Sequence, residues 1–174
     1  MSEARPADAD LLSLAEEIGG ALSSRSAILT TAESCTGGLV AKLVTDIAGS
    51  SEWFDRAFIT YSNEAKEQML GVPASLLAQH GAVSREVVLS MVSGALGRSR
   101  STIGVSLSGI AGPGGATPGK PVGTVWIGWG MQDSAQSMLA PEAQCFQFDG
   151  DRDTVRRLAA VYALRGIIDR LGTE

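Results

Sequence analysis

Histidine and cysteine are scarce in this sequence. One histidine, His80, and two cysteines, Cys35 and Cys145, stand among 174 residues. Two cysteines cannot build the disulfide framework of a small secreted domain, and their spacing is not that of a zinc site. One histidine adds no metal-binding pattern to them. We therefore expect neither a metal ion nor a cofactor.

Basic residues and long apolar runs are also few. Lys and Arg number 14 against 19 Asp and Glu, which gives a formal net charge of −5 and an isoelectric point near 4.9. An acidic chain with few aromatic residues is a poor match for nucleic-acid binding. No run approaches the roughly 18 apolar residues that span a bilayer, and the polar N-terminal stretch is unlike a secretory signal. These absences predict a cytoplasmic protein that binds neither nucleic acid nor membrane.

The chain has enough apolar residues to bury one core. Hydrophobic residues make up 44% of the sequence, and the mean hydropathy is +0.12. This length is typical of one domain. We expect a single domain over residues 1–174, with residues 1–8 disordered.

Strand-like and helix-like patterns alternate along the chain. Their order predicts an α/β fold: a three-layer sandwich with a mixed, mostly parallel sheet flanked by helices. The last two strands have no helix between them, so we expect them to be antiparallel. The expected strands are 27–32, 54–61, 102–108, 122–129 and 145–148. The expected helices begin near Asp8 or Asp10, Leu39, Ser62 or Asn63, Ala74, Ser84 and Asp151.

The first segment with candidate chemistry is TAESCTGG at 31–38. Small residues between a strand and a helix allow backbone N–H groups to converge on an anion, either a phosphate or an oxyanion. Ser34 and Cys35 are both possible nucleophiles at this turn. The alternative is structural: Ser34 or Thr36 caps the helix, and Cys35 is a small buried residue.

The second segment is TYSNEAK at 60–66. If Asn63 is the N-cap, Lys66 occupies the third position of the helix, where the helix dipole disfavours a cation. The same effect favours a neutral amine, which a lysine needs in order to act as a base. A solvated surface lysine is the alternative.

Two further segments are suited to binding a ligand. A glycine-rich stretch at 109–119 follows a strand, at the sheet edge where ligands often bind, but it matches neither a P-loop nor a dinucleotide fingerprint. Arg152, just past the Asp151 cap, is suited to a bidentate grip on phosphate. A flexible loop and a surface salt bridge are the respective alternatives. Together the four segments indicate nucleophilic hydrolysis or nucleotide binding without metal, and they do not name the substrate.

Five stretches in this order resemble the CinA C-terminal domain family, whose stand-alone members are nicotinamide mononucleotide amidohydrolases. The resemblance covers roughly residues 10–170. It implies a compact α/β sandwich, usually a homodimer, that hydrolyses the carboxamide of nicotinamide mononucleotide to nicotinate mononucleotide and ammonia in pyridine nucleotide recycling. The matching stretches are TAESCTGG (31–38), TYSNEAKEQMLGV (60–72), HGAVS (80–84), SGIAGPGGATPGKPVGTVWIG (108–128) and FDGDRDTVR (148–156).

The resemblance also implies roles for individual residues. Ser34, rather than Cys35, would attack the amide carbon, and Lys66 would take its proton. Tyr61 would orient the base or donate to the oxyanion. Backbone N–H groups from Cys35 to Gly38 would form the oxyanion hole, and Arg152 would hold the 5′-phosphate. The implied substrate-binding residues are Cys35, Thr36, Gly37, Gly38, Ser108, Gly109, Gly112, Gly114 and Arg152.

A catalytically silent nucleotide-binding or adaptor domain is the alternative function. Such a domain has no need of a serine hydroxyl, a tyrosine hydroxyl and a lysine amine in these stretches. This chain has all three, at Ser34, Tyr61 and Lys66, and we therefore predict an enzyme.

Overall fold

Five strands form the central sheet, in the order β2-β1-β3-β4-β5. The structure is a computed structural model that describes residues 4–133, 135 and 137–172. β1 pairs in parallel with β2 and β3, and β4 pairs antiparallel with β3 and β5. The mixed sheet is therefore confirmed, with β4 alone running against the others. The strands are β1 (Leu29–Glu33), β2 (Phe54–Ile59), β3 (Ile103–Gly109), β4 (Thr124–Met131) and β5 (Glu142–Gln147).

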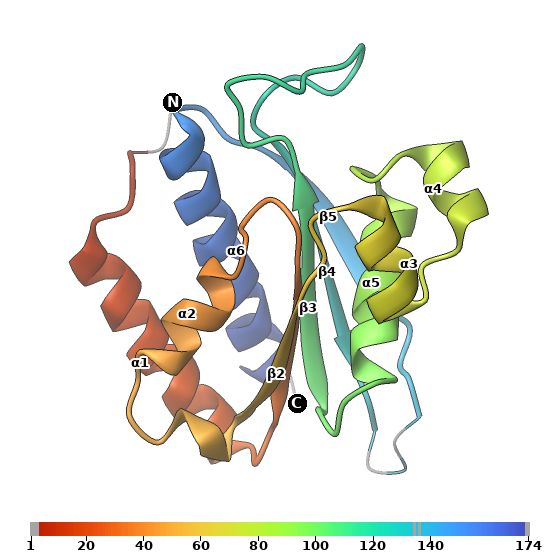
Figure 1. The fold of residues 1–174 in the computed structure, drawn as a ribbon. Coiled ribbons are helices and arrows are strands. Elements are labelled where there is room, and N and C mark those ends of the chain that lie inside the picture. Colours follow the sequence, from red (N-terminus) through yellow and green to blue (C-terminus); the bar gives the residue numbers. More distant parts are fainter. Residues whose placement is uncertain (1–3, 134, 136, 173–174) are drawn as a thin grey trace.

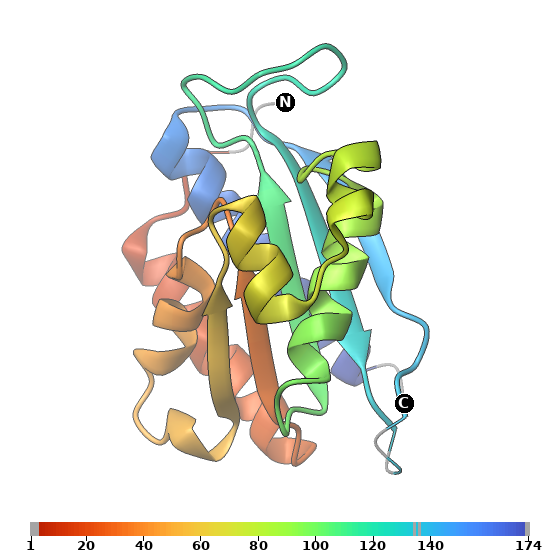
Figure 2. The ribbon, with the colours of Figure 1, turned by 45° about the vertical axis from the view of Figure 1, so that its right-hand side comes forward.

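Helices cover both faces of the sheet, as expected for a three-layer sandwich (Figure 1). One face is covered by α1 (Asp8–Ser24), α2 (Leu39–Thr45) and α6 (Arg152–Gly172). The other is covered by α3 (Asn63–Leu70), α4 (Ala74–His80) and α5 (Arg85–Leu96), which stand in front of the sheet in Figure 2. A short 3₁₀ turn, η1 (Ser50–Glu52), precedes β2. In the described ranges, no helix is both long and apolar enough to cross a membrane.

Two apolar clusters hold these layers together. The larger lies under α1, α2 and α6 and includes Ile18, Leu107 and Leu164, all fully buried. The smaller lies under α3, α4 and α5 and includes Leu70 and Met91. β1 is buried along its whole length, which is typical of a central strand covered on both faces. The ends of β1 and β3 are therefore fixed from both sides.

The connections create a topological switch point at the carboxyl ends of the strands. From β1 the chain crosses through α2 to β2, and from β2 it crosses the opposite face through α3, α4 and α5 to β3. Strand order thus reverses between β1 and β3. In α/β sheets, ligands bind outside the carboxyl ends of the strands at such a switch point.

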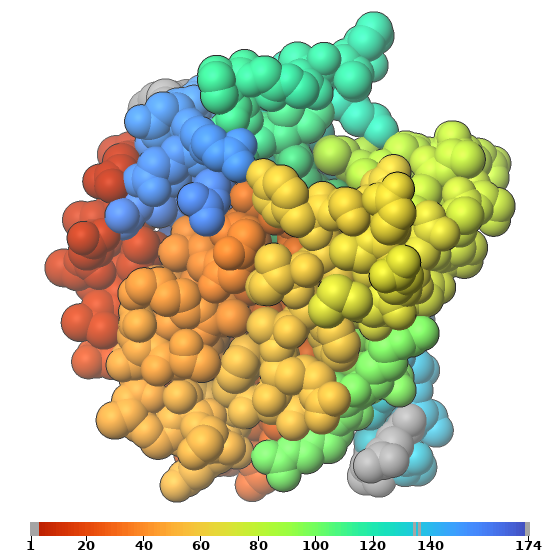
Figure 3. Space-filling view, viewed as in Figure 1, coloured from red at the N-terminus to blue at the C-terminus, as the bar shows by residue number. Residues whose placement is uncertain are grey.

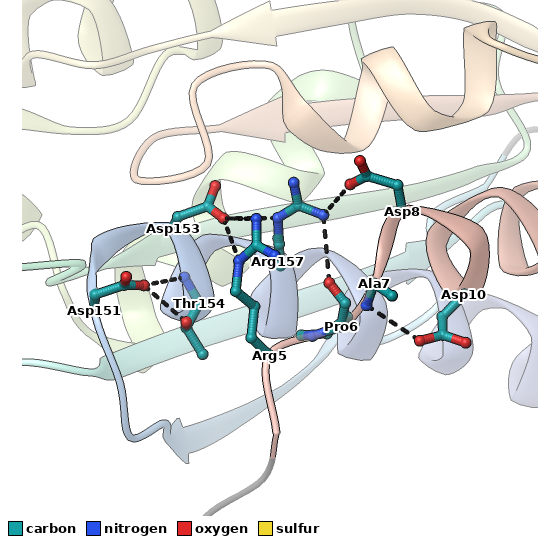
Figure 4. Close-up of polar contacts among 9 residues, drawn as sticks. All are labelled: Arg5, Pro6, Ala7, Asp8, Asp10, Asp151, Asp153, Thr154 and Arg157. Atoms are coloured by element: carbon teal, nitrogen blue, oxygen red, sulfur yellow. Dashed lines mark hydrogen bonds and ion pairs between the residues drawn. The ribbon is translucent and has the colours of Figure 1, made fainter.

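The chain before α1 is tied to the start of α6 (Figure 4). Arg5 and Arg157 both bind the Asp153 carboxylate, and Arg157 also binds Asp8. These ion pairs hold the pKa of Asp153 below its usual range, mainly through the hydrogen bond from Arg5. Our expectation of disorder covered residues 1–8, of which 1–3 lie outside the described residues. From Ala4 onward the chain makes these defined contacts.

The boundaries of β4 and β5 differ from our sequence-based expectations. β4 begins at Thr124 rather than at Val122, because Gly123 turns the chain with a φ of +91° and donates its N–H to Ile110 O. β5 begins at Glu142, earlier than expected, because its exposed edge carries polar residues that mask the strand pattern. Of the two expected N-caps of α3, Ser62 is confirmed, since its hydroxyl accepts from the N–H of Ala65.

Candidate active site

The turn after β1 brings Ser34 to the switch point. Its backbone N–H donates to Leu107 O in β3 at 3.0 Å, and its carbonyl accepts from the N–H of Gly37 at 3.0 Å. Gly37 and Gly38 have φ values of +58° and +95°, a left-handed conformation that favours glycine. The tight turn leaves Ser34 only 9% exposed.

Lys66 reaches Ser34 from the first turns of α3. Its Nζ lies 3.2 Å from Ser34 Oγ and donates to the carbonyl oxygen of Thr60 at 2.8 Å and, more weakly, of Ser62 at 3.5 Å. The side chain is 1% exposed, and in the described part of the chain it makes no ion pair. Burial without a counter-charge lowers the pKa of Lys66 from its usual 10.5.

The position of Lys66 in its helix differs from our expectation. Because Ser62 and not Asn63 is the N-cap, Lys66 is the fourth residue of α3 rather than the third. The main cause of its lowered pKa is burial, since desolvation penalises the charged amine. The structure thus excludes the alternative of a solvated surface lysine.

Cys35 packs into the core, and in the described ranges no hydrogen bond joins its thiol to Lys66. Its side chain is 6% exposed and belongs to the larger apolar cluster. Burial, assisted by the nearby Glu33, raises the pKa of the thiol to about 12. A thiol in this state is almost entirely protonated at neutral pH, and the thiolate is the nucleophilic form.

The turn offers fewer free backbone donors than its sequence suggests. The N–H of Gly37 donates to Ser34 O, and the N–H of Gly38 donates to Glu33 Oε2 at 3.0 Å. Among the described residues, the N–H groups of Cys35 and Thr36 donate to no other residue. The predicted oxyanion hole from Cys35 to Gly38 therefore narrows to these two donors.

Two of the hydroxyl groups predicted to bind substrate, those of Thr36 and Ser108, donate hydrogen bonds within the fold. Thr36 is fully buried and donates its hydroxyl to Glu33 Oε2 at 2.7 Å. Ser108 is 1% exposed and donates to Ala82 O at 2.7 Å, which fixes the end of β3 to the loop before α5. Gly109 has a packing reason to be glycine, because a Cβ there would lie 2.8 Å from Thr124 O.

Arg152 joins Tyr61 and Gly112 beyond the carboxyl ends of β2 and β3. Arg152 donates to the Tyr61 hydroxyl and to Gly112 O, each at 2.8 Å. The corresponding segments, after β2, after β3 and before α6, meet on one face in Figure 3. Tyr61 makes no hydrogen bond with Lys66 in the described chain, and its side chain is 61% exposed. Gly114 lies exposed further along the same loop.

Two residues at this site, Glu33 and Arg156, were not predicted from the sequence. Glu33 is fully buried and accepts hydrogen bonds from the turn and from the first residues of α2. Arg156 donates to Thr36 O at 2.7 Å, and its buried Nε has no partner among the described residues. Glu33 lies in the stretch 31–38 and Arg156 in the stretch 148–156. The position of Glu33 directly before the candidate nucleophile could have indicated its role.

A separate cavity lies away from this site. A cavity of about 540 Å³ opens at the opposite end of the sheet, between Thr102, Met131 and Arg170. Neither Ser34 nor Lys66 lines it. In the described ranges, no three His, Cys, Asp or Glu side chains gather closely enough to hold a metal ion.

These features define an α/β protein with a buried serine–lysine pair at the carboxyl edge of its sheet. The chain belongs to the CinA C-terminal domain family, whose model matches residues 11–171. It is 56% identical over 158 residues to the nicotinamide-nucleotide amidohydrolase PncC of Escherichia coli K12, with 91% of this chain and 93% of that protein covered. The protein of that name from Pseudomonas putida is 48% identical over 164 residues, covering 94% and 98%.

A solved structure has the same fold. The crystal structure of competence damage-inducible protein A from Klebsiella pneumoniae matches with a TM-score of 0.87 and 38% identity. The match covers 94% of this chain and 98% of that one.

Proposed function

We propose that this protein hydrolyses the carboxamide of nicotinamide mononucleotide to nicotinate mononucleotide and ammonia. The observation that carries the mechanism is the 3.2 Å contact between Ser34 Oγ and Lys66 Nζ, inside a buried site. The substrate is proposed from the printed names of relatives that this chain matches over most of its length.

The contacts of Lys66 suit a neutral amine. A neutral Nζ has two N–H groups and one lone pair. In this state the carbonyl groups of Thr60 and Ser62 accept the two N–H groups. The lone pair then remains to accept the proton of the Ser34 hydroxyl, whose Oγ lies 3.2 Å from Nζ. The lowered pKa of Lys66 favours this state, which is the one a general base requires.

The reaction then proceeds in two steps. Ser34 Oγ attacks the carboxamide carbon while Lys66 Nζ takes the hydroxyl proton, and the N–H groups of Cys35 and Thr36 stabilise the oxyanion. Collapse breaks the C–N bond, and Lys66 returns the proton to the departing nitrogen, which leaves as ammonia. Lys66 then takes a proton from a water molecule that attacks the Ser34 ester. The ester C–O bond breaks, Lys66 returns the proton to Ser34 Oγ, and the nicotinate product leaves.

Arg152 and Tyr61 are proposed to bind the nucleotide. Two N–H groups of the Arg152 guanidinium are used for Tyr61 and Gly112, which leaves others for the 5′-phosphate. Tyr61 orients this guanidinium rather than the lysine. The loop after β3, including Gly112 and Gly114, would close over the ribose.

Three broader proposals rest on the family resemblance and on the composition of the chain. The enzyme recycles pyridine nucleotides in the cytoplasm, it needs no cofactor, and it works as a homodimer. Light scattering on purified protein would test the dimer.

Ammonia release from nicotinamide mononucleotide, with free nicotinamide as a parallel substrate, tests the function. We expect release from the nucleotide and little from nicotinamide, which lacks the phosphate that Arg152 binds. Arg152→Ala should raise KM for the nucleotide more than it lowers kcat. Binding of the nucleotide without release of ammonia would instead support the silent nucleotide-binding domain.

A further inference from the structure

Glu33, the last residue of β1, holds the candidate nucleophile turn from inside. It is fully buried, and both carboxylate oxygens accept hydrogen bonds. Oε2 accepts from the Thr36 hydroxyl at 2.7 Å and from the N–H groups of Gly38 and Val40 at 3.0 and 3.2 Å. Oε1 accepts from the N–H of Ala41 at 2.9 Å and the Thr31 hydroxyl at 3.3 Å.

All of these partners are donors, so the carboxylate form satisfies the site. A buried carboxylate is tolerated when its oxygens are hydrogen-bonded in this way. The first N–H groups of a helix usually need an outside acceptor, such as a ligand anion. At the start of α2 this acceptor is the Glu33 carboxylate. An incoming substrate therefore meets the N–H groups of Cys35 and Thr36, and not the end of the helix.

We propose that Glu33 is a positioning residue for Ser34 and for the two oxyanion donors. Glu33 precedes Ser34 directly and binds the turn at Thr36 and Gly38, on the other side of the nucleophile. From outside, Arg156 binds Thr36 O at 2.7 Å. The Glu33 carboxylate and the Arg156 guanidinium thus bind the turn from two sides. These contacts fix the orientation of the N–H groups of Cys35 and Thr36. This inference rests on the proposed serine mechanism.

The charge of Glu33 has a second consequence at the turn. It is one of the causes, after burial, that raise the pKa of the Cys35 thiol. Glu33 therefore disfavours a thiolate beside the serine, and the turn presents one nucleophile rather than two.

Glu33→Gln tests the proposal with little change in shape. Because both oxygens accept, either orientation of the amide places an NH₂ group against a donor. A misplaced reacting group costs up to about 10²-fold in rate. We expect kcat for nicotinamide mononucleotide to fall by about 10- to 100-fold, with KM nearly unchanged because the Arg152 region is untouched.

A substrate-independent measurement separates this inference from the proposed function. Diisopropyl fluorophosphate phosphorylates a reactive serine and releases fluoride, and mass spectrometry locates the modified residue. Ser34 should be labelled in the wild type and labelled more slowly in Glu33→Gln, by a factor similar to the loss in kcat. Wild-type labelling without ammonia release would refute the proposed function, and the labelling rates would still decide the role of Glu33.

Thr102→Val is the matched control for simple destabilisation of β1. The Thr102 hydroxyl accepts from the N–H of Ile28 at 3.0 Å, just before β1 and at the end far from Ser34. Losing this one hydrogen bond should lower Tm by about 2–4 °C, with kcat and the labelling rate unchanged.

Substitutions at Thr36 keep the test open if Glu33→Gln does not fold. Thr36→Val removes one donor to the carboxylate and should lower kcat more than Thr36→Ser, which keeps the hydroxyl. Unchanged kcat and labelling in a folded Glu33→Gln protein, or in Thr36→Val, would overturn the proposal. A wild type that neither reacts with the probe at Ser34 nor releases ammonia would overturn it as well, because no reactive serine would be present to position.

Discussion

At the scale of single residues, the site depends on a lysine that the fold keeps away from both water and counter-charge. Lys66 is 1% exposed and contacts two carbonyl oxygens and one hydroxyl. A charged amine is costly in such surroundings. Burial of Lys66 therefore lowers the stability of the folded protein at neutral pH, and the same burial provides a base beside Ser34.

The pH dependence of activity should report this lysine. Because burial lowers the pKa of Lys66 from 10.5, kcat should rise with pH as the amine loses its proton, with a midpoint below 10.5. Lys66→Arg should be inactive across the range, since arginine stays protonated. A pH–rate profile of the two proteins would check this, and an active arginine variant would contradict it.

The lowered pKa of Lys66 should also make the stability of the folded protein depend on pH. Between the folded pKa of Lys66 and 10.5, the unfolded chain binds one more proton than the folded chain, so stability rises with pH across that window. The Tm of the wild type relative to Lys66→Met should therefore increase as pH rises toward 10.5. Thermal melts of both proteins over this range would measure it, and a difference independent of pH would speak against the buried amine.

Cys35 should be dispensable for catalysis. Its thiol is buried and, with a pKa near 12, protonated at neutral pH. Cys35→Ala should leave kcat nearly unchanged and cost some stability through the smaller side chain, whereas Ser34→Ala should lower kcat by several orders of magnitude. Steady-state rates and melting temperatures would be compared. The reverse pattern would make Cys35 the nucleophile.

At the scale of elements, the close packing of α3 against α5 sets the position of Lys66. A Cβ on Gly94 of α5 would lie 2.1 Å from the carbonyl oxygen of Leu70, the last residue of α3. No flexible side chain separates the two backbones there. Moving α3 would therefore move Lys66 away from the serine.

Gly94→Ala should accordingly lower both stability and kcat. Overpacking of this kind costs about 1–3 kcal/mol, and displacement of α3 should lower the rate further. Gly97→Ala is the matched control one turn along the chain, because a Cβ there makes an ordinary contact with Ser93 O at 3.4 Å. Urea unfolding and kcat of both variants would test this. Equal effects of the two substitutions would show that α3 does not set the lysine's position.

Local patterns predict most of the elements but not the contacts that complete the site. The helical period from Leu11 to Leu22 and the N-cap at Ser84 are visible in the sequence, and the structure confirms both. The partner of Arg152 at Tyr61 is 91 residues away in the chain. The partner of Arg156 at Thr36 is 120 residues away. Periodicity and capping rules describe neighbours along the chain, so these contacts required the structure.

At the scale of the whole molecule, topology brings together chemistry that is distant in sequence. The carboxyl ends of β1, β2 and β3 carry Ser34, the loop to Lys66, and Ser108 to one edge of the sheet. The alternation of strands and helices predicts this meeting. It does not predict the role of Glu33. In the sequence a buried acid cannot be told from an exposed one, because its hydrogen-bond donors are known only from the structure.

The most direct test of this account is the kcat of a Ser34→Ala/Lys66→Met double variant beside the two single variants, on nicotinamide mononucleotide. Residues that act as one unit lose their effect together, so the double variant should be scarcely slower than either single one. Losses that multiply in the double variant would show that Ser34 and Lys66 act independently, which would contradict the serine–lysine mechanism.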